Sequence, residues 1–379
     1  MRILLSCAEL GLGHVSRIIP LGKRLEQHGH ELFFFSGGKA YELLQKEFKN
    51  VSEVTPISWY ENSHGILTSA SLLNTLIPLP LFNSELNRFE MKNSNAYETI
   101  HRYYDLRQNI LDISPDILVS DGDINALRLA SRWKIPAVYV ENMIRPGYGF
   151  SSLLSPGERF IERYYKVCKK IVIPDNPPPY TVSEYSIGDL EHMGVADRTE
   201  YVGSFVDTKP EWGAGEHVFV PISGPVGTRG KLLKTVLPVL EKFKGKCIIS
   251  LGTPGKKVSA KIANYELHTW LSAEERRHAM LNAKYVIFSG GHATCFETIK
   301  YGKPSICIPT QPEQLGNAAK LEKMKCSIVA KNENQLQKAV NTLETELDGY
   351  KKNVETLSKF SGKFRGLDRA VEIIESIHD

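Results

Sequence analysis

The chain of 379 residues lacks the features that mark several special classes of protein. Its six cysteines are scattered without a Cys-x-x-Cys pair, and several lie in apolar runs, so we expect buried reduced thiols, a reducing compartment and no metal site. No segment approaches the roughly 20 apolar residues of a membrane helix. Hydrophobic residues make up 42% and charged residues 24%, which excludes disordered and collagen-like chains. The N-terminus runs from an apolar stretch into a glycine loop, which predicts a first strand and no signal peptide.

The net charge of +4 conceals an uneven distribution. Residues 1–207 hold 21 basic and 25 acidic side chains, a net of −4, whereas residues 208–379 hold 26 and 18, a net of +8. The split suggests two domains with different ligands, with an anion favouring the second. The positive charges are spread out, without a basic helix or a stacking motif, so a nucleic-acid partner is not expected.

Short apolar runs alternate with amphipathic stretches, which is typical of parallel sheets covered by helices. We expect an α/β protein with two Rossmann-like domains, at 1–207 and 217–379, joined by a linker at 208–216. The pattern leaves open whether a last helix at 366–378 packs on the second or the first domain. In the first domain, strands are predicted at 2–7, 31–36, 117–120, 137–141, 170–173 and 200–202, and helices at 16–28, 39–48, 83–113, 124–133 and 158–169. In the second, strands are predicted at 217–222, 246–251, 265–269, 285–289, 305–309 and 326–330, and helices at 230–243, 272–281, 295–301, 315–324 and 334–347.

A glycine loop, Gly11-Leu-Gly-His14, follows the first predicted strand and opens a helix. Glycines permit a tight turn and close approach to a ligand, and the helix N-terminus favours an anion. A dinucleotide fingerprint would need a third glycine where Ser16 stands, so we do not expect NAD. His14 could serve as a general base, or it could be a loop histidine that packs or caps the helix.

A second acidic turn, Asp121-Gly-Asp123, ends a predicted strand in the same half. Asp121 could orient His14 in the way that a carboxylate orients a histidine base. Asp123 is expected first to cap the helix that begins at Ile124, and a metal site built on this short motif is the weaker interpretation.

The most informative stretch lies between His268 and Asn317. It contains a strand, a Gly-Gly turn and a helix start at Ser289-Gly-Gly-His-Ala-Thr294, which predicts a phosphate site built from backbone N–H groups. Glu297 lies one turn later, where it could bind two hydroxyls of a ribose. The spacing Thr294-x-x-Glu297 is also that of a capping box.

Gly-Gly-His-Ala-Thr-x-x-Glu, Gly-Lys-Pro-x-x-x-x-Pro and Glu-Gln-x-x-Asn resemble the donor region of GT-B glycosyltransferases of the MurG-like, family 28 type, including archaeal members. Gly11 to His14 and the loop Ile222-Ser-Gly-Pro225 are similar to two further loops of that family. The chain has Ser289-Gly-Gly-His-Ala where members often carry an arginine or serine and a Gly-Ala pair, which leaves the donor's identity open.

The resemblance implies the GT-B fold, two domains facing a cleft, and a residue assignment. Backbone near Trp270 and Leu271 would hold the base, most often uracil, and Glu297 the ribose. Glu313 and Gln314 would meet hydroxyls of the transferred sugar, although a polar turn before a helix is the alternative, and Arg229 would neutralise phosphate unless it is only a solvated loop arginine. The remaining expected donor contacts are Gly11, Gly13, Ser223, Gly224, Thr253, Gly290, Gly291, His292, Ala293 and Thr294.

The resemblance further implies an inverting, metal-independent hexosyltransferase that moves a sugar from a nucleotide-sugar, with a UDP-sugar as the first candidate, to an acceptor hydroxyl. His14 would be the base with Asp121 behind it; Ser289 stands where retaining enzymes often carry a glutamate. No cofactor is expected, since the nucleotide-sugar is a substrate. An epimerase or hydrolase on the same fold, and a non-catalytic binding protein, are the alternatives.

The acceptor is expected on the acidic first half. Its most apolar segment, 72–82, could dock a lipid-linked acceptor or a cell-envelope glycan, or touch the inner face of the membrane of a cytoplasmic protein. The alternative, which we rank first, is a buried loop or helix packed on the sheet. The aromatic stretch from Tyr97 to Tyr104 predicts a helix face in the core.

Overall fold

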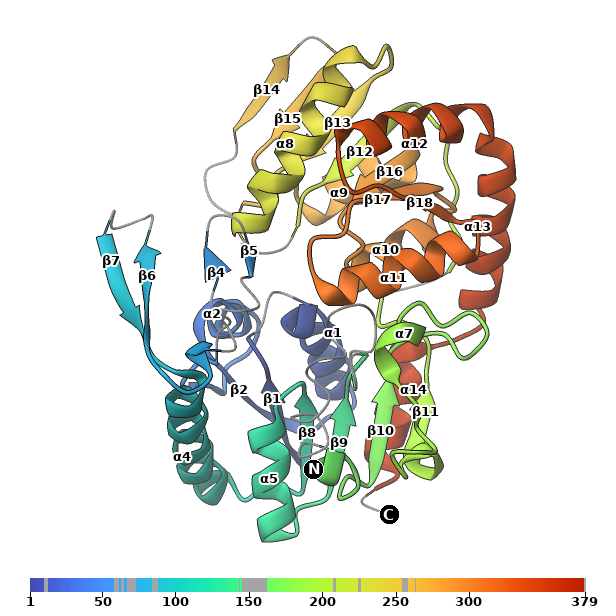
Figure 1. Ribbon diagram of the computed structural model, residues 1–379. Helices are drawn as coiled ribbons and strands as arrows, with labels where there is room; N and C mark the ends of the chain where they lie inside the picture. Colours follow the sequence, from blue (N-terminus) through green and yellow to red (C-terminus); the bar gives the residue numbers. More distant parts are fainter. Residues whose placement is uncertain are drawn as a thin grey trace.

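Two seven-stranded sheets, one above the other, organise the computed structural model (Figure 1). It describes residues 1–9, 13–57, 61–62, 65–66, 73–83, 88–142, 144, 162–206, 209–223, 226–253, 258–262 and 264–377. In these ranges, no helix is both long enough and apolar enough to cross a membrane.

The first sheet has the strand order β11-β10-β9-β8-β1-β2-β3, and all its neighbouring strands are parallel. Every strand predicted for this half is present, within one residue at each end. The strands are β1 (Arg2–Cys7), β2 (Glu31–Ser36), β3 (Val51–Glu53), β8 (Ile117–Asp121), β9 (Ala137–Val140), β10 (Lys170–Ile173) and β11 (Thr199–Tyr201). The helices are α1 (Gly13–Gln27), α2 (Gly38–Glu47), α4 (Asn95–Ile113), α5 (Ile124–Trp133), α7 (Glu184–Ile187) and the 3-10 turn η2 (Ala196–Arg198).

The second sheet repeats the plan in the order β14-β15-β13-β12-β16-β17-β18, with only the edge pair β14–β15 antiparallel. Its strands are β12 (His217–Pro221), β13 (Cys247–Ser250), β14 (Ser259–Ile262), β15 (Tyr265–His268), β16 (Ala283–Phe288), β17 (Ser305–Cys307) and β18 (Ser327–Val329). Its helices are α8 (Val226–Lys242), α9 (Ala273–Leu281), α10 (His292–Lys300), α11 (Pro312–Lys323), α12 (Glu333–Thr345) and α13 (Leu347–Ser361).

Each sheet is covered on both faces because its central strands are apolar on both sides. In β1, Ile3 and Leu5 pack with residues of α1 and α2, and Leu4 packs with residues of α4 and α5. In β12, Val218 and Phe219 face the two opposite layers of the second half. These alternating contacts give four buried clusters, two for each sheet.

The last helix, α14 (Gly366–Glu375), packs on the first half of the chain. Ala370 and Ile374 are fully buried in the cluster that contains α1, and α14 lies beside β10 and β11 in Figure 1. The chain passes closely over the first sheet here: a Cβ on Gly366 would lie 2.1 Å from the carbonyl oxygen of Ser204. The structure thus answers the question that the amphipathic pattern left open.

The expectation of one helix over 83–113 is wrong. The chain forms a hairpin of β6 (Leu79–Asn83) and β7 (Arg88–Lys92), and α4 begins only at Asn95, where Ser94 caps it by accepting a hydrogen bond from the Tyr97 amide. The hairpin projects from the first half near the short pair β4 (Glu61–Asn62) and β5 (Gly65–Ile66) (Figure 1).

The predicted burial of the segment 72–82 is also wrong for its most exposed apolar residues, although Asn74 is buried. Leu73, Leu76 and Ile77 have 59%, 77% and 50% of their surface exposed. The aromatic stretch of α4 is a core face only in part: Tyr103 packs against the core, whereas Tyr97 and Tyr104 are 48% and 60% exposed. Helical periodicity alone could not distinguish a core-facing stripe from one that the fold leaves uncovered.

Candidate active site

The predicted site residues gather at the two points where the strand order changes direction. In each sheet the chain first builds outward to one side of the central strand and then to the other, so the crossovers leave a crevice beside the carboxyl ends of the central strands. His14 follows β1 and Asp121 ends β8, its neighbour. Ser223 follows β12 and Gly290 follows β16, the neighbour of β12.

His14 and Asp121 are in direct contact. Nδ1 of His14 lies 2.6 Å from Oδ1 of Asp121, whose side chain is fully buried, and 16% of the His14 side chain is exposed. Gly122 makes room for the imidazole: its φ is +73°, and a Cβ there would lie 2.6 Å from Cε1 of His14. Since a carboxylate only accepts hydrogen bonds, the proton of a neutral imidazole belongs on Nδ1, and Nε2 keeps its lone pair.

Arg17, one turn along α1 from His14, shares the same carboxylate. Its Nη2 lies 2.5 Å from Oδ1 of Asp121 and its Nε 3.1 Å from Oδ2. The guanidinium also reaches Glu141 at 3.4 Å and donates to the amide oxygen of Asn142. Sequence reasoning missed Arg17, Glu141 and Asn142, although the last two immediately follow β9, at the same edge of the sheet.

The charges around this pair shift its titration. Burial by itself lowers the pKa of His14, but the negative charge of Asp121, the hydrogen bond to it and the charge of Glu141 together raise that pKa above its ordinary value. Burial raises the pKa of Asp121, but the charges of Arg17 and His14 outweigh it and the pKa is lowered. The site therefore keeps Asp121 ionised and favours a proton arriving on His14.

The same side chains are close enough together to bind one metal ion. Among the described residues, His14, Asp121 and Glu141 offer one ligand atom each, all within 4.8 Å of one another. Arg17 bonds to both carboxylates, so a divalent ion would have to displace, or lie beside, a permanent positive charge. The donor set is thus better suited to the guanidinium than to a metal ion.

Asp123 is a helix cap, as the sequence predicted. Its Oδ1 accepts hydrogen bonds from the amides of Asn125 and Ala126 at the start of α5. Its Oδ2 accepts from Ser6 at 2.6 Å and from the buried Arg102 at 2.8 Å. Both oxygens are therefore occupied, which argues against the metal interpretation of Asp121-Gly-Asp123.

The Gly290-Gly291 turn brings two helix starts together on the donor side. Gly290 has φ +88°, and a Cβ there would lie 2.9 Å from the carbonyl oxygen of Gln314 in α11. Gly291 is the N-cap of α10, and no side chain caps its first turn. Asn317 fixes the turn by donating to the carbonyl oxygen of Gly290 at 3.1 Å. The backbone N–H groups at the start of α10, from His292 and Ala293 onward, are thus available to an anion.

Glu297 lies one turn into α10 in a two-point contact with Arg276 of α9. The distances are 3.0 Å from Nε to Oε1 and 2.5 Å from Nη2 to Oε2. The capping-box alternative is wrong, because the N-cap is Gly291 and Thr294 already lies inside the helix. A capping box does form at Ser272 and Glu275, at the start of α9. Arg276, which carried no sequence signal, holds the Glu297 carboxylate in place.

The side chain of His292 is turned toward the first half of the chain. Its Nε2 lies 3.1 Å from Oδ2 of Asp175, a fully buried carboxylate that also accepts from the amide and hydroxyl of Ser183. His292 therefore joins the two halves through Nε2 of its ring, and its backbone N–H remains for the predicted anion contact.

Glu313, in the first turn of α11, makes a contact between the two halves. Its Oε1 accepts from Nδ2 of Asn142 at 3.2 Å and lies 3.5 Å from Nδ2 of Asn317. A continuous series of hydrogen bonds thus runs from His14 through Asp121, Arg17 and Asn142 to Glu313. Gln314 serves its own turn instead: its Oε1 accepts from both the amide and the hydroxyl of Thr310 at 2.9 Å.

Several other expected donor residues lie around the same edge of the second sheet. Arg229 of α8 donates to the carbonyl oxygen of Gly252 at 3.0 Å and to the hydroxyl of Thr253 at 3.2 Å, so it is tied to the loop after β13. Trp270 is 41% exposed beside the buried Leu271. Gly13 begins α1, and Gly11 and Gly224 lie outside the described residues.

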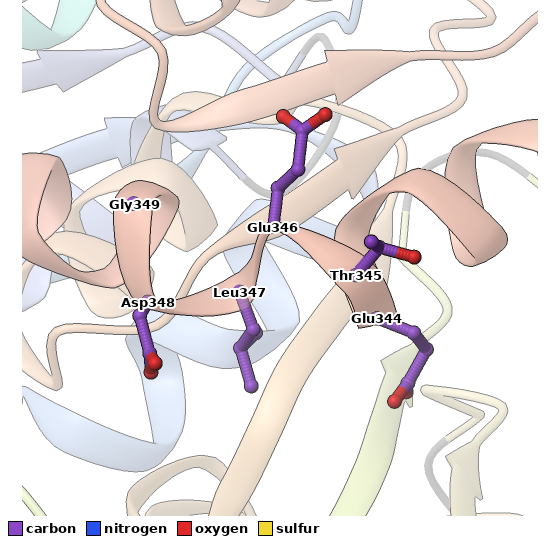
Figure 2. A pocket seen from close by; sticks show the side chains of 6 residues that line it. All are labelled: Glu344, Thr345, Glu346, Leu347, Asp348 and Gly349. Carbon is purple, nitrogen blue, oxygen red and sulfur yellow. The ribbon is translucent and has the colours of Figure 1, made fainter.

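A shallow depression elsewhere in the second half is lined by none of the predicted residues. It lies at the junction of α12 and α13, between Glu344 and Gly349, and presents acidic side chains (Figure 2). An anion is not expected there, and Glu344 already pairs with Lys284.

Comparisons with known proteins agree with the expected family. Residues 235–367 match the glycosyltransferase family 28 C-terminal domain. Two proteins called "Uncharacterized glycosyltransferase", from Methanosarcina acetivorans and Methanosarcina mazei, are each 25% identical over 401 aligned residues. The alignments cover 99% of this chain and 98% of the first protein, and 96% of this chain and 99% of the second.

Two solved structures of similar fold are distant from this chain in sequence. The spinosyn rhamnosyltransferase SpnG, in complex with thymidine diphosphate, is 15% identical with a TM-score of 0.69, over 99% of this chain and all of that one. MurG of Acinetobacter baumannii is 14% identical with a TM-score of 0.61, over 99% of both chains. The expected GT-B fold of two Rossmann-like domains is confirmed.

Proposed function

We propose that the chain is a glycosyltransferase of the family 28, GT-B type, and that it moves a hexose from a nucleotide-sugar to an acceptor hydroxyl with inversion and without a metal ion. The observation that carries the proposal is the hydrogen-bonded series from His14 to Glu313, which connects a base candidate on the first half with a sugar-binding candidate on the second.

His14 is the proposed base. With Nδ1 held by Asp121, Nε2 is the ring nitrogen that can accept the proton of an acceptor hydroxyl as its oxygen attacks the anomeric carbon. The resulting imidazolium lies against the ionised Asp121, with Glu141 close by. Attack from the face opposite the leaving group inverts the anomeric centre, in keeping with Ser289 in place of a second carboxylate.

The leaving diphosphate is proposed to lie on the Gly290-Gly291 turn. As the sugar–phosphate bond breaks, negative charge grows on the phosphate, and the uncapped N-terminus of α10 supplies N–H groups and a helix dipole toward it. Glu297 would bind the ribose and Glu313 the transferred sugar. The thymidine diphosphate in the SpnG complex supports a pyrimidine nucleoside diphosphate here, with UDP as the first candidate.

The acceptor is proposed to bind the first half, near the β6–β7 hairpin. Leu76, Phe89 and Met91 expose 77%, 72% and 64% of their surface there. Large exposed apolar side chains close together mark binding surfaces on many proteins. A lipid-linked acceptor or an envelope glycan presented at the inner face of a membrane would fit, with the protein cytoplasmic and peripheral.

The proposal is tested with purified protein and radiolabelled UDP- and dTDP-sugars, with and without lipid and glycan acceptor fractions. Nucleoside diphosphate release that depends on an acceptor supports transfer, and a product of inverted anomeric configuration supports the mechanism. Release or isomerisation of the sugar without an acceptor would contradict it in favour of a hydrolase or an epimerase.

His14→Ala tests the assignment of the base. The variant should keep nucleoside diphosphate affinity, measured by calorimetry, and lose turnover by a factor on the order of 10²–10⁴, the usual contribution of general base catalysis. His278→Ala, on α9, is the matched control. Turnover of His14→Ala equal to wild type would refute the assignment.

A further inference from the structure

Arg17 has an environment that a base and its carboxylate partner do not by themselves require. The side chain is 10% exposed, yet it carries a permanent positive charge. It contacts both oxygens of Asp121, one oxygen of Glu141 and the amide oxygen of Asn142. A buried guanidinium with this many partners is held in one place, and its Nη2 lies 3.0 Å from Nδ1 of His14.

The charged groups around His14 come from four elements. Asp121 ends β8, Glu141 follows β9, Arg17 belongs to α1, and Glu313 of α11 is near enough to interact with the charge of Arg17. Cys7 of β1 stays neutral, because burial raises the pKa of its thiol well above the ordinary value. In this described group, three carboxylates thus face one guanidinium, and any further positive charge would come from protonation of His14.

Asn142 holds this arrangement together across the two halves. Its Oδ1 accepts from Arg17, and its Nδ2 donates to Oε1 of Glu313 at 3.2 Å. The amide is therefore oriented by an acceptor on one side and a donor on the other. Replacing it by a group that only accepts would keep the contact with Arg17 and lose the contact with Glu313.

We propose that Arg17 and Asn142 are positioning residues that set the protonation of His14 and link it to the position of Glu313 on the opposite half. The inference deepens the proposed function and rests on it for its meaning in catalysis. Without the positive charge of Arg17, the neighbouring carboxylates would raise the pKa of His14 further, and a protonated imidazole cannot act as a base. With Arg17 in place, Asp121 still orients the ring, and Nε2 remains able to accept a proton.

Nuclear magnetic resonance of the imidazoles tests the charge effect without a substrate. His14 is identified as the signal absent in His14→Gln, and its titration is compared in wild type, Arg17→Met and Arg17→Lys. Removing a charge this close should raise the pKa of His14 by about one unit or more in Arg17→Met, and Arg17→Lys should stay within roughly 0.3 units of wild type. Arg24→Met, two turns along the same helix and 42% exposed, is the control that should leave His14 unchanged.

Asn142→Asp is the second variant, and it remains decisive if Arg17→Met does not fold. It draws the charge of Arg17 away from Asp121, so the pKa of His14 should rise, and it places a carboxylate against Glu313. In the transfer assay it should lower kcat more than about tenfold while the affinity for UDP changes less than about twofold. The acid limb of its pH profile should move to higher pH, together with the titration of His14.

A wild-type titration of His14 in folded Arg17→Met, or in Asn142→Asp, would overturn the inference. A normal kcat in Asn142→Asp would overturn the link to Glu313. Because the titration needs no transfer reaction, failure of the charge arrangement can be distinguished from failure of the proposed function. Shifted titrations in a protein that transfers no sugar would refute the proposed function and leave the charge arrangement in place.

Discussion

Ile374→Ala tests the packing of the last helix on the first half, which the sequence pattern left open. Ile374 is fully buried in the cluster that contains α1 and β1, far from it in sequence. The substitution removes three buried carbons, worth about 0.8 kcal/mol each, and leaves a cavity that adds to the loss, so we expect a destabilisation of ~3 kcal/mol. That is a large part of the ~5–15 kcal/mol by which a domain is typically stable.

Hydrogen exchange measured by mass spectrometry locates the effect. A loss of ~3 kcal/mol should speed exchange of the most protected amides by about a hundredfold, and the peptides affected should be those of α1 and β1. Leu343→Ala, in α12, is the matched control: its side chain is equally buried, but in the cluster around β12. It should speed exchange in the second half and leave α1 protected.

The hydrogen-exchange patterns of the two variants test where the last helix packs. If Ile374→Ala increases exchange in α12 and leaves α1 unchanged, the last helix packs on the second half in solution. If it changes neither, the side chain is not buried.

Three further predictions follow from the site and the surface around it. Glu297→Gln should weaken UDP binding about tenfold by calorimetry, and an unchanged affinity would refute the ribose assignment. Burial raises the pKa of Asp123, but the charge and hydrogen bonds of Arg102 outweigh burial and lower that pKa. The stability that the ionised Asp123 adds is therefore present above the ordinary aspartate pKa and is lost as the pH falls through the lowered pKa. Arg102→Met should make acid unfolding, followed by circular dichroism, begin at higher pH, and an unchanged onset would contradict this. The double variant Phe89→Ser, Met91→Ser should abolish co-sedimentation with anionic vesicles; failure of wild type itself to sediment would refute the membrane contact.

The parallel strands were predictable because each is a short apolar run closed by turn residues. Ile117 and its neighbours are apolar on both faces, so their sequence alone marks a buried strand. The β6–β7 hairpin was not predictable in the same way. Its outward residues, such as Phe89 and Met91, are apolar although exposed, and its continuity with α4 gave the false appearance of one long helix.

Part of the candidate site was also predictable from the sequence, and part was not. The glycine turns follow from local sequence, since each lies directly after a predicted strand. The contact between His14 and Asp121 also needs β1 and β8 to be neighbours in the sheet. Arg276 gave no signal, because it meets Glu297 only through the packing of α9 beside α10. The capping-box spacing at Thr294 was misleading, because a glycine cap three residues earlier starts the helix.

The link between the halves through Asn142 could have been predicted from the strand topology. Once β1 and β8 are placed at the change in strand direction, the next strand outward must also end at the site, and the residues after β9 are Glu141 and Asn142. The charges would then identify a further partner. Asp121 and Glu141 beside His14 leave an excess negative charge, and Arg17 is the cation of α1 on the same face as His14. The uneven charge of the two halves could not lead to this, because it counts surface side chains, whereas the site depends on a few buried ones.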